Sequence, residues 1–178
     1  MYLVVAQEFG GLRTDLLLRF CRIYDCSLSN VMVARAFSNS EVREILSGLE
    51  VEGASVVLAY PYSFLPRDPS EYWEATAISG LIARVSQRNR TFIFNTYTKF
   101  GDKLPEGGSM HHHVVKVIVK LVKQGSRVLA ELVKHPGKPS GALAVFHVKL
   151  LEDIALLEKR KTLLDWVTRK QERAEALG

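Results

Sequence analysis

The sequence predicts one α/β domain in which a mainly parallel sheet is followed by antiparallel strands and a long terminal helix. Two observations carry this prediction. Short apolar runs alternate with amphipathic helical patterns as far as residue 95, as in sheets built from β–α units. Beyond residue 113 the β-rich segments are separated only by short turns, which favours antiparallel pairing. The length of 178 residues, 47% of them hydrophobic, suits a single core.

The first half contains four runs with the composition of buried parallel strands, which are apolar throughout because helices cover both faces of such sheets. These runs are residues 2–6, 31–37, 55–60 and 91–95. Helical spacing of apolar residues follows the first three runs and predicts helices over 12–24, 38–49 and 72–87. Ser38 and Glu41 have the spacing of a capping box at the start of the second helix. The connections are therefore expected to be right-handed crossovers.

The second half begins with residues 96–113, whose three glycines and one proline predict a long loop of the kind usually kept for function. Three further runs have strand composition, at 114–122, 127–134 and 142–148. Residues 150–177 carry apolar side chains near helical spacing and predict a long amphipathic helix. We expect a core over residues 1–149 and a terminal helix over 150–178 within the same domain.

Charge and cysteine content set the broad class of the protein. The net charge of +5 and the pI of about 9.3 favour polyanionic partners such as nucleic acid. No apolar run approaches the ~20 residues that a membrane-spanning helix requires, so no membrane contact is expected. Cys21 and Cys26 form neither a C-x-x-C pair nor an even disulfide framework, and no secretory segment is recognised. These features predict a reducing, cytoplasmic setting.

Three strings of residues resemble one known family. Residues 31–39 read V-M-V-A-R-A-F-S-N and resemble the I-Y-V-A-R-A-F-N strand of RecA/RadA recombinases. Residues 105–113 are similar to the P-x-G-G-x-x-x-x-H string that ends the family's second DNA-binding loop. Residues 130–141 resemble its A-R-L-x-x-S-P-x-x-P-x-G hairpin. The strings occur in the family's order within residues 2–149 and look most like the archaeal RadA paralogue branch, which implies a RecA-like three-layer core.

The sequence departs from the family at the ATPase positions. A family ATPase holds phosphates with G-x-x-x-x-G-K-[ST], and this chain contains no such string. Its third strand offers Ala59 or Tyr60 where the family's Walker B aspartate helps to hold Mg²⁺, and neither side chain replaces a carboxylate. Glu8 corresponds to the catalytic glutamate or is a solvated loop residue, and Asn95 corresponds to the polar sensor position or ends a strand. The resemblance therefore implies a pseudo-ATPase with no catalytic residue and no cofactor.

The loop after the fourth strand is the main candidate for contact with DNA. It combines cations with aromatic rings, as surfaces that bind single strands do. Its candidate residues are Tyr97, Lys99, Phe100 and Lys103. Arg67 and the group of Arg84, Arg88 and Arg90 extend this surface, or the arginines of that group stabilise the C-terminus of the helix predicted over 72–87.

The three consecutive histidines of the same loop, residues 111–113, are not expected to bind a metal. Neighbouring side chains of an extended segment point to opposite faces and cannot converge on one ion. In the family's frame, His112 or His113 is the histidine that closes the loop, and the other histidines are exposed. His112 is therefore included among the candidate contacts to DNA.

The resemblance implies an accessory protein in homologous recombination and DNA repair that binds single-stranded DNA, a RadA-type recombinase, or both. Two alternatives remain open at this point. One is a structural or protein-interaction scaffold without DNA binding, and the other is a subunit that completes an ATPase site in trans. Residues 150–178 either pack on their own sheet or form a surface for docking or self-association.

Overall fold

The structure is a computed structural model that describes residues 1–7, 14–66, 73–97 and 104–147. The chain divides into two compact units, Met1–Lys116 and Val117–Gly178. Each unit is described separately below. The predicted terminal helix over residues 150–178 lies outside the described residues, as does Glu8.

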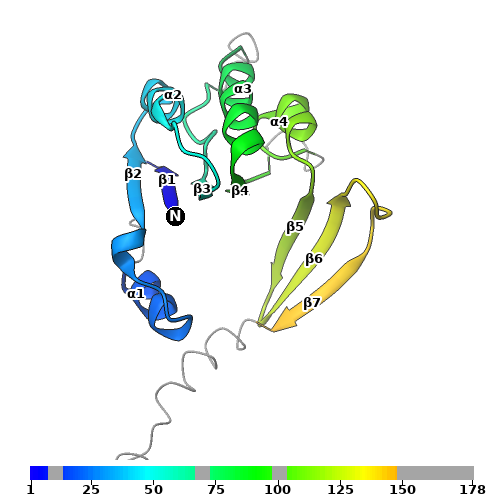
Figure 1. Ribbon diagram of the computed structural model, residues 1–178. Helices are drawn as coiled ribbons and strands as arrows, with labels where there is room; N and C mark the ends of the chain where they lie inside the picture. The colour runs from blue at the N-terminus through cyan, green and yellow to red at the C-terminus, as the bar shows by residue number, and fades with distance from the viewer. Residues whose placement is uncertain (8–13, 67–72, 98–103, 148–178) are drawn as a thin grey trace, which may run out of the picture. The chain divides into compact units, whose positions relative to one another are not determined.

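The first unit is built on a four-stranded parallel sheet, as the alternation of strands and helices predicts (Figure 1). Its strands are β1 (Tyr2–Ala6), β2 (Met32–Ala36), β3 (Ser55–Ala59) and β4 (Arg90–Phe94). They lie in the order β2-β1-β3-β4, and every pair is parallel. Because β1 is followed by β2 on one side and flanked by β3 on the other, the direction of winding reverses between β1 and β3.

Helices connect these strands at nearly the predicted positions. They are α1 (Thr14–Ile23), α2 (Asn39–Gly48) and α3 (Trp73–Arg88), and a short 3₁₀ helix, η1 (Leu28–Asn30), precedes β2. The capping box is confirmed, since the Ser38 hydroxyl accepts a hydrogen bond from the Glu41 amide at 3.2 Å. The Glu41 carboxylate in turn accepts one from the Phe37 amide at 2.8 Å. Both bonds satisfy amides that the first turn of α2 and its approach leave unpaired.

The core lies on one face of the sheet, between the strands and helices α2 and α3. Its buried side chains come from alternate positions of the strands and from one stripe of each helix. They include Val4, Ala36, Leu46, Val56, Leu58, Ile78 and Ile82. On the opposite face Val33, Phe92 and Phe94 are each more than half exposed. A three-layer core buries both faces of its sheet. In the described residues only one face of this sheet is fully buried.

The predicted loop 96–113 is wrong at its carboxyl end, because residues Gly108–Val114 form a helix, α4. Gly107 precedes this helix with a φ of 86°, a left-handed conformation that suits glycine. The three histidines thus lie on a helix and not on an extended segment. The strand predicted to begin at residue 114 begins only at Ile118 for the same reason.

The second unit contains a three-stranded antiparallel sheet, as predicted. Its strands are β5 (Ile118–Gln124), β6 (Arg127–Lys134) and β7 (Leu143–His147), in that order across the sheet. Two residues join β5 to β6, and one of them, Gly125, has the positive φ that such tight hairpins require.

Cys21 and Cys26, which the spacing analysis left unpaired, form a disulfide bond at the end of α1. Cys21 is the one buried residue of that helix. The bond joins the last turn of α1 to the segment that leads into η1 and β2.

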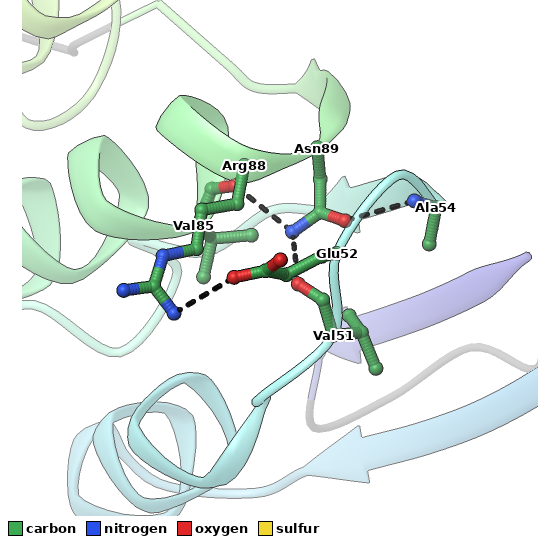
Figure 2. Close-up of polar contacts among 6 residues, drawn as sticks. All are labelled: Val51, Glu52, Ala54, Val85, Arg88 and Asn89. Carbon is green, nitrogen blue, oxygen red and sulfur yellow. Dashed lines mark hydrogen bonds and ion pairs between the residues drawn. The ribbon is translucent and has the colours of Figure 1, made fainter.

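The amino edge of the sheet is held by Asn89, which follows α3 (Figure 2). Its side-chain nitrogen donates to the carbonyls of Val51 at 2.8 Å and Val85 at 3.1 Å. Its side-chain oxygen accepts from the Ala54 amide at 3.0 Å. One amide group therefore joins the end of α3 to the segment that enters β3. Beside it Arg88 and Glu52 form an exposed ion pair at 3.3 Å.

We expect Asn89→Ala to lower the free energy of unfolding by about 2–3 kcal/mol, because three backbone groups lose their partner. Arg88→Ala is the matched control from the adjacent position. It should lower the free energy of unfolding by no more than about 0.5 kcal/mol, because an exposed ion pair contributes little. Urea unfolding followed by circular dichroism measures both values. Equal losses in the two variants would contradict the role assigned to Asn89.

Candidate nucleic-acid interface

The candidate site lies at the carboxyl edge of the parallel sheet. In open α/β sheets ligands bind outside the carboxyl ends of the strands, near the point where the winding reverses. Here that point lies between β1 and β3, and the residues that leave the strands are Gln7, Phe37, Tyr60 and Asn95. The contacts of these exits decide what this edge can do.

The exit of β3 has an unusual backbone conformation. Tyr60 has a φ of 57°, in the left-handed region that costs a residue with a side chain about 1–2 kcal/mol. Its amide nevertheless donates to the Phe94 carbonyl of β4 at 2.8 Å, so the sheet ladder extends to this residue. Three residues later the Ser63 hydroxyl donates to the Ala6 carbonyl at the end of β1. The turn is thus held on both sides, and strained residues held in this way cluster at functional sites.

The loop after β4 rises from a closed stem. Tyr97 and Pro105 form an isolated antiparallel bridge, and the Glu106 amide donates to the Thr96 carbonyl at 2.8 Å. The Asn95 side chain donates to the Glu106 carbonyl at 2.8 Å and accepts from the Thr96 amide at 3.0 Å. Asn95 therefore does more than end a strand, because its amide group closes the base of the loop. Three of the candidate contacts to DNA, Lys99, Phe100 and Lys103, belong to the loop and lie outside the described residues.

A buried polar cluster lies next to this stem. The hydroxyl of Tyr62 lies 2.8 Å from the Ser79 hydroxyl of α3 and 3.1 Å from Nδ1 of His111 of α4. All three side chains are buried, and the Tyr62 and His111 rings meet edge to face with their centres 5.1 Å apart. Burial raises the pKa of Tyr62 to about 12, and the hydrogen bond with Ser79 opposes this shift. The cluster joins the exit of β3, the middle of α3 and the helix that follows the loop.

Gly107 is fitted against this cluster. A Cβ atom at this position would lie 2.7 Å from Cζ of Tyr62 and 2.9 Å from Cβ of His111. Sequence reasoning missed Tyr62, Ser79 and His111 as a group, since nothing in their spacing connects residues so far apart along the chain. The Gly107-Gly108 pair was the one local signal that the backbone approaches another group closely here.

The expected roles of the histidines need correction. His111, which the family frame left exposed, is the buried member of the three, whereas His113 is exposed and His112 half-buried. His112 and His113 follow the loop and the stem in sequence, within α4. Within the described part of the chain no three metal-binding side chains gather at one point.

The structure places Arg88 and Arg90 away from the stem of the loop. Arg88 and Arg90 lie at the amino end of β4, whereas Tyr97 lies beyond its carboxyl end. Arg84 donates to the carbonyls of Leu46 at 3.2 Å and Ser47 at 2.8 Å, so it caps the last turn of α2. Arg84 therefore stabilises the end of α2, which is a different helix from the one whose C-terminus it was expected to stabilise. Arg67 lies outside the described residues.

Comparison with known proteins defines the class of fold. The parallel sheet of β–α units followed by an antiparallel sheet is a RecA-like fold. The chain is similar to the crystal structure of the RadB recombinase, with a TM-score of 0.61 and 17% sequence identity over 83% of this chain and 75% of that one. No protein-family model matches the chain, and no curated protein sequence does. No helix in the described residues is both long and apolar enough to cross a bilayer.

Replacement of Gly107 by alanine tests the close packing beneath the stem. We expect Gly107→Ala to lower the free energy of unfolding by about 2–4 kcal/mol, because the new methyl group overlaps the Tyr62 ring and φ is positive. Gly53→Ala is the control, since Gly53 has a φ of 69° and no atom within 4 Å of an added Cβ. It should lose about 1 kcal/mol from the backbone alone. Thermal and urea unfolding give the two values, and a difference near zero between the variants would argue against the contact.

The raised pKa of Tyr62 predicts that the free energy of unfolding falls at alkaline pH. The unfolded chain releases this proton near the ordinary value of 10.0, whereas the folded chain holds it to about 12. Between these values stability falls as pH rises, by about 1.4 kcal/mol per pH unit. Tyr62→Phe lacks this contribution, so the stability gap between wild type and variant should narrow between pH 10.0 and about pH 12, the window set by the two pKa values. Urea unfolding across that range measures the gap, and a gap that stays constant would contradict the prediction.

Proposed function

We propose that this protein is a non-catalytic relative of RadA/RecA recombinases that acts as an accessory protein in homologous recombination and DNA repair. It binds single-stranded DNA through the loop between β4 and α4, and it binds without ATP. The observation that carries the proposal is the closed stem at Tyr97 and Pro105, because the sequence between these two residues is rich in cations and aromatic rings. The RecA-like fold supports the same assignment.

Chemistry supports contact between this loop and a single strand. Lysine ammonium groups neutralise phosphates, and exposed aromatic rings stack on bases of any sequence. Lys99 and Lys103 supply the charges, Phe100 supplies one ring, and the half-buried Tyr97 at the stem supplies a second. The net charge of +5 adds a general attraction to polyanions. This combination favours binding that depends on salt and little on sequence.

The absence of catalysis is part of the proposal. The chain has no G-x-x-x-x-G-K-[ST] string, and Ala59 and Tyr60 at the end of β3 carry no carboxylate to hold Mg²⁺. The strained Tyr60 backbone and the stem instead serve binding. A RadA-type recombinase is the protein partner that this role implies, and the cytoplasm is where such a partner works.

Fluorescence anisotropy with a labelled single-stranded oligonucleotide tests the function, at low and physiological salt, with and without ATP and Mg²⁺. We expect binding that is independent of ATP and weakens steeply with salt. The double variant Lys99→Ala/Lys103→Ala should bind roughly tenfold more weakly at low salt and show a shallower salt dependence. Arg88→Ala/Arg90→Ala removes the same charge from the opposite end of β4. The affinity of this variant for the oligonucleotide should fall by less than about threefold, because only the net charge of the protein has changed.

Two results would count against this function. No binding at low salt would favour the protein-interaction scaffold. Equal loss in both double variants would show that general charge, and not the loop, attracts DNA. Tyr97→Ala and Phe100→Ala separate stacking from charge, because they should weaken binding without changing its salt dependence.

A further inference from the structure

The two cysteines are brought together by the backbone at the end of α1. The Tyr24 amide donates to the Phe20 carbonyl at 2.9 Å, and the Cys26 amide donates to the Cys21 carbonyl at 2.8 Å. Between them Asp25 has a φ of 50°, the left-handed conformation that ends many helices. The chain therefore reverses and sets the Cα atoms of Cys21 and Cys26 4.5 Å apart, within the range that disulfides occupy.

The backbone bonds and the left-handed residue that shape this turn do not require the sulfur–sulfur bond. The two thiols are expected to remain neighbours after reduction, so that either state can convert to the other without rearrangement of the sheet. The two sulfurs also differ in access. Cys26 is exposed, whereas Cys21 is 5% exposed, so an external thiol reaches Cys26 first.

We propose that Cys21 and Cys26 form a reversible oxidation site that exchanges with a low-molecular-weight thiol and disulfide couple of the glutathione class. Oxidation holds the last turn of α1 closed, and reduction lets that turn open. The site is independent of the proposed contact with DNA.

The exchange balances in two steps. The Cys26 thiolate attacks glutathione disulfide, which forms a mixed disulfide and releases one glutathione thiolate that takes up a proton. The Cys21 thiolate then attacks the Cys26 sulfur and releases the second glutathione. One sulfur–sulfur bond is made in the protein and one is broken in the oxidant, which gains the two electrons that the protein loses.

The position of the pair explains why its state matters for α1. Cys21 is the buried residue of the helix, while Phe20 and Tyr24 stack on one another in exposed positions. The segment after Cys26 leads through η1 to β2, and the terminal ammonium of Met1 donates to the Asn30 carbonyl at 2.6 Å. The disulfide thus ties the last turn of α1 to a segment that is anchored beside β1.

Thiol titration after denaturation, with the full chain first equilibrated in glutathione buffers, tests the chemistry. We expect no free thiol and a monomer at the oxidising end of the series, two free thiols at the reducing end, and a single transition between them. Cys26→Ser keeps one thiol throughout that series and forms no intramolecular bond. Two free thiols at every ratio, or a disulfide-linked dimer, would overturn the proposal.

Limited trypsin digestion tests the effect on α1, because Arg22 is exposed and lies inside the ring that the disulfide closes. We expect cleavage after Arg22 to be about tenfold faster in the reduced protein, as the last turn opens more often. Cleavage after the exposed Arg88 at the end of α3 is the internal control and should not change. In Cys26→Ser the rate of cleavage after Arg22 should equal that of the reduced wild type and should not depend on the glutathione buffer. Equal rates in both states of the wild type would reject control of the turn by the disulfide.

Discussion

The hydroxyl of Tyr62 lies within hydrogen-bond distance of both Ser79 of α3 and His111 of α4, and all three side chains are buried. A buried polar group is stabilising only while its partners are in place, so this contact fixes three segments at once. It positions the exit of β3, which follows the strained Tyr60, and the helix that ends the loop after β4. The stem of that loop ends at Glu106, one residue before Gly107, which lies against the Tyr62 ring. The stem of the candidate interface is therefore joined to the sheet and to α3 through Tyr62.

The groups at the two edges of the parallel sheet have different roles. At the amino edge the polar side chains are used within the fold, since Asn89 bonds three backbone groups (Figure 2). Arg84 in turn caps α2. At the carboxyl edge the backbone is strained at Tyr60 and a loop stands on a closed stem. This division is expected for parallel sheets, whose carboxyl ends are where ligands bind. Arg88 and Arg90 lie at the amino edge of this sheet.

Much of the fold was predictable because its signals are local. Continuous apolar runs and helical spacing identified β1 to β4 and the helices between them, and Ser38 with Glu41 marked the start of α2. The turn before Arg127 identified the hairpin of β5 and β6. The predicted loop failed over α4, because that short helix is stabilised by a contact between His111 and a tyrosine 49 residues earlier. The pairing of Cys21 with Cys26 was missed because it follows from the left-handed backbone at Asp25.

The sequence by itself determined the alternation of strands and helices, the loop that carries the cations and aromatic rings, and the lack of a carboxylate at Ala59 and Tyr60. Each of these is a property of neighbouring residues. The tertiary structure alone decided which of three adjacent histidines is buried, because their local chemistry is identical and only the rotation of α4 toward Tyr62 distinguishes them. It also decided that Asn95 closes the base of the loop, since its partner Glu106 becomes a neighbour only when the chain returns to the sheet.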